Sequence, residues 1–183
     1  MIPMKYLALL RGINVGGNNI VRMSDLRACL ESAGCRRVAT YIQSGNVLFS
    51  SSLKSTQGVV AMIETALSET LVPKAQAVVV SEPHLEQVVK EAPAAFAEGA
   101  SEYRRDVLFL KEHLRAEDLL PTIHLKPGVD QAFVANGVLY FMRLVARASQ
   151  SYLPKVINLP AYKSMTVRNW ATTTKLYDLM QEL

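Results

Sequence analysis

The sequence predicts an α+β protein built from two ferredoxin-like, or split βαβ, halves, each an antiparallel sheet with its helices packed on one face. Residues 1–81 follow the order β-α-β-β-α-β, which defines this unit. Residues 82–183 repeat most of that order as β-α-β-β-α, with the last strand missing or hidden, although no sequence repeat is visible. We therefore expect one domain at 1–81 and a second, closely packed on it, at 82–183.

The first half gives the clearer pattern. The strand expected at Lys5–Leu10 is a nearly continuous apolar run, typical of a central strand buried on both faces. The following helix is expected to have Ser24 as its N-cap and to end at Gly34. The dipeptide Ser44-Gly45 predicts a two-residue hairpin turn between the next two strands. A second helix, stopped by Pro73, and a strand at 76–80 complete the unit.

This topology predicts one contact between distant parts of the chain. The split βαβ unit has the strand order 4-1-3-2, so its first and third strands are neighbours. The loop after the first strand and the hairpin between the second and third strands then lie at the same end of the sheet. We therefore expect Arg11–Asn19 to lie close to Gln43–Asn46.

The second half is less regular. The dipeptide Asn136-Gly137 is the strongest hairpin signal in the chain, and it joins strands expected at 131–135 and 138–144. Pro154 and Pro160 predict an irregular segment or a broken helix over Tyr152–Lys163. The remaining expected elements are a helix at Leu85–Ala92, a strand at Asp106–Leu110, a helix at Ala116–Leu120 and a last helix from about Asn169.

Charge is unevenly distributed along the chain. Residues 1–50 carry six Lys and Arg against two acids, and residues 143–175 carry six with no acid, whereas residues 82–118 carry nine acids against five bases. If the two basic segments meet in the fold, they favour an anionic ligand or an acidic partner. The alternative is a solvated basic face. The carboxylates of 82–118 are expected on another solvated face.

The expected compartment is the cytoplasm. The sequence shows no secretory signal, and its apolar runs are far too short to cross a bilayer, so no membrane association is predicted. Cys29 and Cys35 are too few for a disulfide framework, which fits a reducing environment. Cys29 falls on an apolar helix stripe, whereas Arg36 and Arg37 beside Cys35 could lower its pKa.

The loop after the first strand is the main candidate binding site. Gly12 and Gly17 are spaced as in a P-loop, but Asn18-Asn19 replaces the required Lys and Ser/Thr, and no Gly-x-Gly-x-x-Gly is present. Both standard phosphate-binding motifs are therefore excluded. The loop can still turn backbone amides toward an anion, or it can serve only as a tight connection. Its candidate ligand-binding residues are Arg11, Asn14, Gly16, Gly17 and Asn18.

Two further groups of residues could complete that site. The hairpin offers Tyr41, Gln43, Ser44 and Asn46, which could bind a polar ligand or could satisfy the backbone of the neighbouring loop. The start of the last helix and its flanks offer Lys163, Arg168, Asn169, Trp170 and Lys175. There an arginine can bind a carboxylate or phosphate. The alternative is a capped helix whose tryptophan fills the gap between the two halves.

Other chemistries have little support in the sequence. His84, His113 and His124 lack ligand spacing, so no metal site is expected, and no cofactor is predicted. No nucleophile–base pattern is present, so catalytic residues and enzymatic activity are left open. The expected third strand lacks the aromatic signature of the RNA-recognition motif, and basic charge alone supports only weak, salt-sensitive nucleic-acid binding.

Three segments resemble the signatures of a bacterial family, domain of unknown function 1697. They are LRGINVGGNN at Leu10–Asn19, YIQSGNVLF at Tyr41–Phe49 and TVRNWATTTKL at Thr166–Leu176. The resemblance implies a cytosolic bacterial protein of two ferredoxin-like halves, and it implies no known activity or substrate. The chain departs from the family pattern at Ala171, where Asn is usual, and at Ile20, where Lys is frequent.

Three hypotheses about function follow from these observations. The first is a protein that binds a small anionic or nucleotide-like ligand at the loop after the first strand. The second is a nucleic-acid-binding protein, and the third is a structural or protein-interaction module without a ligand. The sequence predicts no oligomeric state.

Overall fold

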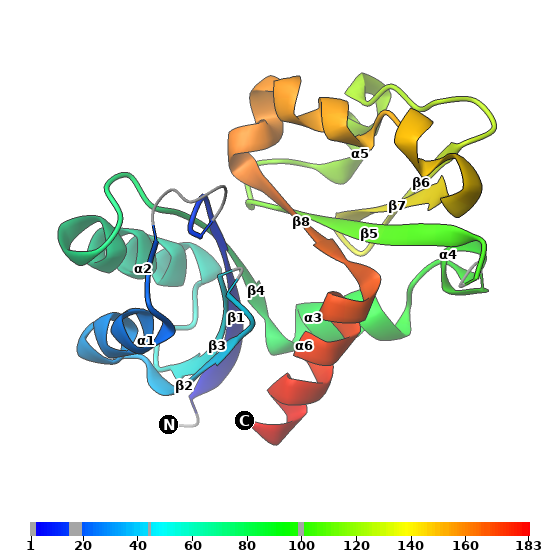
Figure 1. Cartoon of the computed structure of the whole chain (residues 1–183). Coiled ribbons are helices and arrows are strands. Elements are labelled where there is room, and N and C mark those ends of the chain that lie inside the picture. Colours follow the sequence, from blue (N-terminus) through cyan, green and yellow to red (C-terminus); the bar gives the residue numbers. More distant parts are fainter. Residues whose placement is uncertain (1–2, 15–19, 44, 99–100) are drawn as a thin grey trace. The chain divides into compact units, whose positions relative to one another are not determined.

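A computed structural model describes residues 3–14, 20–43, 45–98 and 101–183 (Figure 1). The chain divides into two compact units, the first made of Met1–Leu85 with Lys175–Leu183 and the second of Glu86–Thr174. Both divisions fall inside helices, α3 (Glu82–Lys90) and α6 (Trp170–Glu182). The expected single boundary at residue 81 therefore differs from this division, because the last residues of α6 group with the first unit.

The first unit has a four-stranded antiparallel sheet. Its strands are β1 (Met4–Arg11), β2 (Arg36–Tyr41), β3 (Asn46–Ser51) and β4 (Gln76–Ser81), in the order β2-β3-β1-β4. Read from the other edge, this is the predicted order 4-1-3-2. Strand β1 is central, pairing with both β3 and β4, which explains its continuous apolar run.

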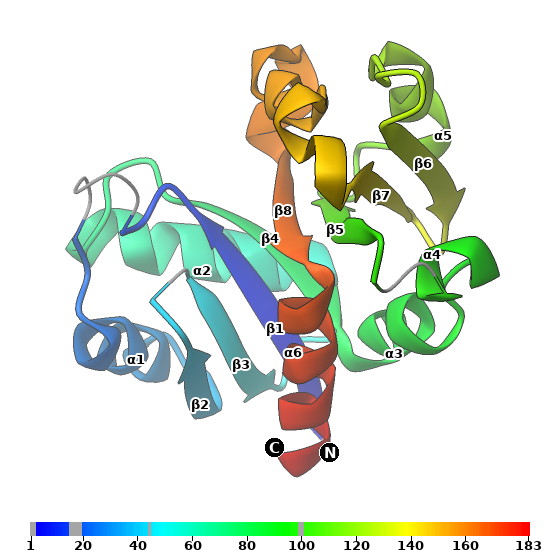
Figure 2. The ribbon, with the colours of Figure 1, turned by 45° about the vertical axis from the view of Figure 1, so that its right-hand side comes forward.

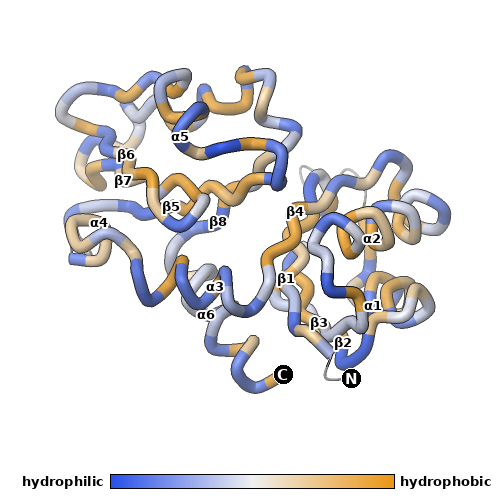
Figure 3. The backbone as a smooth tube through the Cα atoms, turned by 180° about the vertical axis from the view of Figure 1, so that it is seen from behind, coloured by the Kyte–Doolittle hydropathy of each residue, from blue (hydrophilic) through white to orange (hydrophobic). Residues whose placement is uncertain are grey.

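Helices α1 (Met23–Ser32) and α2 (Thr56–Thr70) pack on one face of this sheet, as Figure 2 shows. Side chains alternate between the faces of a strand, so Tyr6, Ala8 and Leu10 of β1 point to the same side. They share one hydrophobic core with buried residues of both helices, including Leu26 and Ile63. Strand β4 of this sheet is strongly apolar, as the orange colour of its tube in Figure 3 shows.

The two ends of α1 show one wrong prediction and one correct one. The N-cap is Arg22, and Ser24 lies in the first turn, where its hydroxyl contacts Asp25. At the other end, Gly34 has φ +98°. The Gly34 amide donates to the carbonyl of Glu31, and the next amide, that of Cys35, donates to the carbonyl of Leu30. This pair of bonds is a Schellman motif, for which glycine is the preferred residue.

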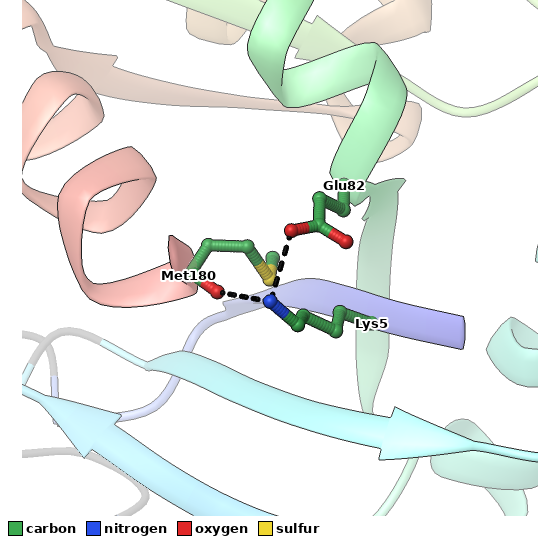
Figure 4. A network of polar contacts seen from close by, with 3 residues as sticks. All are labelled: Lys5, Glu82 and Met180. Carbon is green, nitrogen blue, oxygen red and sulfur yellow. Dashed lines mark hydrogen bonds and ion pairs between the residues drawn. The ribbon is translucent and has the colours of Figure 1, made fainter. Parts of the chain in front are cut away.

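The other face of β1 meets the end of α6. Lys5 lies on the same side of the strand as Leu7 and Leu9. Its Nζ donates to Glu82 Oε1 and to the carbonyl oxygen of Met180, both at 3.0 Å (Figure 4). Met180 and Leu7 are fully buried. The last turns of α6 therefore belong to the first unit because their apolar side chains are buried there.

The second unit has the same topology. Its strands are β5 (Tyr103–Leu110), β6 (Asp130–Ala135), β7 (Val138–Leu144) and β8 (Met165–Asn169), in the order β6-β7-β5-β8. The fourth strand, expected to be missing or hidden, is present as β8. It is only five residues long and carries Thr166, Arg168 and Asn169, so its sequence has no apolar run to mark it. Each unit is thus a complete split βαβ fold, and the α+β prediction is confirmed.

The two hairpins differ in loop length. In the second unit, Asn136 and Gly137 have φ 52° and 69°, as the predicted two-residue turn requires. In the first unit, Tyr41 pairs with Asn46 and the loop between them is four residues long. The two-residue turn at Ser44-Gly45 was therefore a wrong prediction.

Short helical segments replace a long crossover helix in the second unit. Between β7 and β8 the chain forms three 3₁₀ segments, η2 (Val145–Gln150), η3 (Leu153–Asn158) and η4 (Pro160–Ser164). This confirms the expected broken helix, because prolines cannot continue an α-helix. The remaining segments are α4 (Ala94–Glu98), α5 (Ala116–Leu119) and η1 (Leu120–Thr122). Within the described part of the chain, no helix has the length and apolarity needed to span a membrane.

Candidate functional site

The loop after β1 contacts the β2–β3 hairpin, as predicted. The Leu10 amide donates to the carbonyl of Gly45 at 2.8 Å. The Asn14 side chain donates to the carbonyls of Gln43 and Val21, both at 3.1 Å, and accepts from the Val21 amide at 2.8 Å. Asn14 thus joins both ends of its own loop to the hairpin. Its amide group is used structurally, which favours the alternative of a tied connection.

Two other hairpin residues are also explained by local structure. Gly45 has φ +75°, and a Cβ atom there would lie 2.9 Å from Leu10 Cβ and 3.0 Å from Ile13 Cδ1, so no side chain fits. Asn46 is fully buried, and its side chain donates to the carbonyl of Tyr41 at 3.1 Å. These contacts close the loop on the body of the first unit.

The remaining candidates of the first unit have no described role in binding. Gly16, Gly17, Asn18 and Ser44 lie outside the described residues. Arg11 ends β1 opposite Gln76 and is half-buried, as is Tyr41, whereas Lys175 is exposed on α6. Ligand binding by this loop stays a prediction.

In the second unit, strand β8 brings the start of α6 beside the start of β5. Asp106 lies opposite Asn169 in the sheet register. Because β8 ends there, residues 103–105 of β5 extend beyond it. The space at this corner is a hollow of about 710 Å³, which we call the arginine hollow. It is lined by Tyr103, Arg104, Arg105, Asp106, Arg143, Asn169, Trp170, Ala171 and Thr174.

An ion pair lies on one side of the arginine hollow. Arg143 Nη2 donates to Asp106 Oδ2 at 3.1 Å, and their side chains are 22% and 9% exposed. Burial raises the pKa of Asp106, and the neighbouring Arg143 partly opposes that shift. Among the described atoms, the buried Nε of Arg143 has no hydrogen-bond partner. The Asp106 carboxylate therefore holds the Arg143 guanidinium at the wall of the hollow. It occupies only part of the guanidinium's hydrogen-bonding capacity.

Arg105 and Trp170 form another wall. Arg105 Nη1 donates to the carbonyls of Phe96 at 3.0 Å and Ala97 at 2.9 Å. Its guanidinium carbon lies 5.7 Å from the Phe96 ring centre and 5.9 Å from that of Trp170, within cation–π range. The two rings meet edge to face at 5.1 Å. Burial lowers the pKa of Arg105. The indole of Trp170 thus packs against both Phe96 and Arg105.

The candidate residues around the start of α6 have separate roles. Asn169 caps the helix, since its side chain accepts from the Thr172 amide at 2.7 Å, as the capped-helix alternative requires of this residue. Arg168 is half-buried and donates to Thr166 Oγ1 at 2.8 Å and to the carbonyl of Val167 at 2.9 Å. Lys163 is exposed on η4. Only Asn169 and Trp170 of the predicted set line the arginine hollow, together with Ala171.

The arginines of the hollow were missed by the sequence reading. Arg104 and Arg105 lie in the acid-rich stretch 82–118, where a segment charge count hides them. These arginines could have been found from the pairing of strands in the second unit. Once Met165–Asn169 is recognised as the fourth strand, the topology places Arg168-Asn169 beside the start of the unit's first strand.

The described ranges also contain cysteines, histidines and carboxylates outside the arginine hollow. No group of three or more His, Cys, Asp or Glu there could hold a metal ion. Burial raises the pKa of the Cys35 thiol to about 11, so the lowered pKa considered from its arginine neighbours was a wrong prediction. His113 Nε2 lies 3.0 Å from Ser164 Oγ, next to the bond from the Lys111 amide to the Ser164 carbonyl. We interpret this pair as a tie between two loops.

The fold and the arginine hollow define an α+β protein of two split βαβ units with a basic hollow in the second. Residues 4–140 match the model of the family described as "Protein of unknown function (DUF1697)", and the chain belongs to this family. The solved structure of "conserved bacterial protein SP0830 from Streptococcus pneumoniae" is similar, with a TM-score of 0.84 and 26% sequence identity over 98% of this chain and 99% of that one. No curated protein matches the chain.

Proposed function

We propose that the protein binds a small anion, a phosphate or a carboxylate, in the arginine hollow. The observation that carries this proposal is the set of residues lining one concave site: three arginines and a single carboxylate. Guanidinium groups match the planar, bidentate geometry of carboxylate and phosphate oxygens. A concave site with converging polar groups is also the usual setting for a small ligand.

The three arginines contribute differently to the proposed binding. Arg105 is held by two carbonyls and two aromatic rings, so it contributes positive charge and part of the wall of the hollow. Arg143 is oriented by Asp106 and keeps further N–H donors. Arg104 is exposed, lies opposite Arg143 in the sheet and adds a further cation. Arg104 and Arg143 are therefore the proposed ligand contacts.

This proposal keeps the anionic ligand predicted from the sequence and places it in the second unit. The loop after β1 is a second candidate location, with Arg11 as its cation. Among the residues that the structure describes, no comparable site favours the nucleic-acid or the protein-interaction hypothesis. We also propose a bacterial, cytoplasmic protein, supported by the bacterial origin of the similar solved structure and by two free cysteines. The proposal concerns binding and includes no reaction.

Calorimetric titration with inorganic phosphate and with citrate tests the proposal. We expect saturable binding that weakens about tenfold in Arg104→Ala, the loss of one charge-assisted contact. Arg104 is exposed, so its removal leaves the fold intact. Arg147→Ala is the matched control, since Arg147 is an exposed arginine of the same unit that contacts Gln150.

Two results would contradict the proposal. One is the absence of binding to either anion at low ionic strength. The other is equal weakening by Arg104→Ala and Arg147→Ala, which indicates general electrostatic attraction. Arg11→Ala distinguishes the two candidate locations, because a loss of affinity in that variant alone places the anion at the loop of the first unit.

A further inference from the structure

The arginine hollow combines two kinds of wall. Cationic side chains come from β5 and β7, and an indole ring comes from the first residue of α6. Trp170 is the only tryptophan of the chain, and it is half-buried. The edge-to-face contact with Phe96 and the guanidinium of Arg105 hold its ring at the hollow. An aromatic wall beside free guanidinium donors suits a ligand with both a charge and a ring.

The charges of the hollow favour a phosphate monoester over a carboxylate. Three arginines and one carboxylate line the hollow, and that carboxylate is already paired with Arg143. The excess positive charge is therefore greater than a single carboxylate ligand neutralises. A phosphate monoester carries up to two negative charges near neutral pH and offers three acceptor oxygens. Those oxygens match the donors that Arg104 and Arg143 present.

The aromatic wall favours a ligand that also carries a flat ring. Stacking on a tryptophan is strongest for a ring that lies flat against a rigidly held indole, and it tolerates different ring types. The hollow, at about 710 Å³, is within the size range of sites for drug-sized ligands, so it is larger than phosphate alone requires.

We infer that the ligand of the arginine hollow is an aromatic phosphate monoester of the nucleoside monophosphate kind, with its phosphate on Arg104 and Arg143 and its ring on Trp170. This inference rests on the proposed anion binding and specifies the ligand class of the same site. It requires that phosphate and ring be recognised together, which distinguishes it from simple anion binding.

Three probes separate the two parts of such a ligand: adenosine monophosphate, ribose phosphate and adenosine. Calorimetry gives their affinities, and the fluorescence of Trp170 reports the ring directly, because no other tryptophan contributes. We expect adenosine monophosphate to bind at least about ten times more tightly than ribose phosphate, since base–aromatic stacking typically contributes that much. Adenosine alone should bind more weakly still.

Variants assign each part of the ligand to its wall. Trp170→Leu should abolish the preference for adenosine monophosphate and leave the affinity for ribose phosphate unchanged, whereas Trp170→Phe should keep part of the preference. Arg104→Ala should weaken both phosphates by the same factor. The ligand comparison in the unaltered protein does not depend on how well any variant folds.

The possible failures are distinguishable. Equal affinities for adenosine monophosphate and ribose phosphate overturn the inference and leave the proposed anion binding intact. Absence of binding by both phosphates, or adenosine binding as tightly as its monophosphate, overturns the proposed function together with the inference.

Discussion

The two units place different residues at the same position of the same fold. In the first unit, Tyr6 lies opposite Phe49 on one side and Ser81 on the other. In the second unit, Asp106 lies opposite Phe141 and Asn169. The registers therefore match residue by residue. The corresponding pairs are Met4 with Arg104, Lys5 with Arg105, Tyr6 with Asp106, Ser51 with Arg143 and Glu82 with Trp170.

The first unit has the uncharged residues Tyr6 and Ser51 where the second has Asp106 and Arg143. The Tyr6 ring stacks on Phe49 at 5.9 Å, and its hydroxyl donates to the Leu53 carbonyl at 2.9 Å. The second unit has the Asp106–Arg143 ion pair there. A buried ion pair generally contributes little net stability compared with well-packed apolar groups. The first unit forms the same fold without this pair, which supports the ligand binding proposed for the second.

The largest effect is expected from giving the first unit the second unit's carboxylate. Tyr6→Asp should lower the free energy of unfolding by at least about 4 kcal/mol, because it removes a stacked ring and buries a carboxyl group with no arginine beside it. Urea unfolding of the purified variant measures this loss.

Tyr6→Phe is the matched control. It keeps the ring and removes only the hydroxyl bond to Leu53, so about 1 kcal/mol is expected. If Tyr6→Asp is no more destabilising than Tyr6→Phe, the first unit tolerates the charge and this support for ligand binding in the second is lost.

The next effect concerns the ion pair itself. Arg143→Met should cost about 2–4 kcal/mol, because Asp106 is left buried without its partner. The double variant Asp106→Leu, Arg143→Met should recover most of this loss. A double variant as unstable as the single one would mean that packing of the arginine stem, not the pair, is responsible.

The same pair predicts a dependence on pH. Burial raises the folded-state pKa of Asp106 above its ordinary value of 3.8, so the folded chain binds this proton before the unfolded chain does. Its contribution to stability therefore increases as pH falls from the raised pKa toward 3.8 and is lost as pH rises back through that pKa. Unfolding of Asp106→Asn over the same pH range should lack this component, and identical pH profiles for the two proteins would contradict it.

The sequence was sufficient for the fold class because the strongest signals are local. The apolar run of β1, the Asn136-Gly137 turn and the prolines of the β7–β8 connection each specify one element. The strand order then follows from topology, and it correctly predicted the contact between Asn14 and the hairpin.

The arginine hollow could not be found this way, because its residues come from three segments joined through β8. That strand is short and half polar, so no periodicity marks it. Arg143 is forty residues or so from Arg104 in sequence, and only the β5–β7 register makes them neighbours. The net charge of the segment 82–118, which contains Arg104, is negative, whereas the side chains that line the hollow are mostly cationic. Side-chain pairing across strands is the missing information.

The hairpins of the two units also differ in how they are held, and Asn14→Ala tests this. In the second unit a residue of the turn itself, Asn136, donates to the carbonyls of Gln87 and Glu91, whereas the longer loop of the first unit is tied by Asn14 from another loop. Loss of three side-chain hydrogen bonds should cost about 2–3 kcal/mol in urea unfolding.

Gln43→Ala is the control for that variant, because Asn14 binds the backbone carbonyl of Gln43 and the exposed side chain is not involved. We expect its effect to stay below about 0.5 kcal/mol. Comparable losses in the two variants would mean that the loop is held by other contacts.

The smallest effect is expected at Lys5, which corresponds to Arg105. Lys5 contacts a carboxylate and a helix carbonyl near the surface, with side-chain exposures of 26% for Lys5 and 30% for Glu82. Solvent screens such a pair, so Lys5→Met should cost only about 0.5–1 kcal/mol. Arg105→Lys should cost more, because lysine cannot reproduce the guanidinium's two carbonyl contacts while it also lies against two rings. Hydrogen exchange should localise the loss of protection in Lys5→Met to residues 175–183. If Lys5→Met loses more stability than Arg105→Lys, the expectation that the second unit depends more on its cation is wrong.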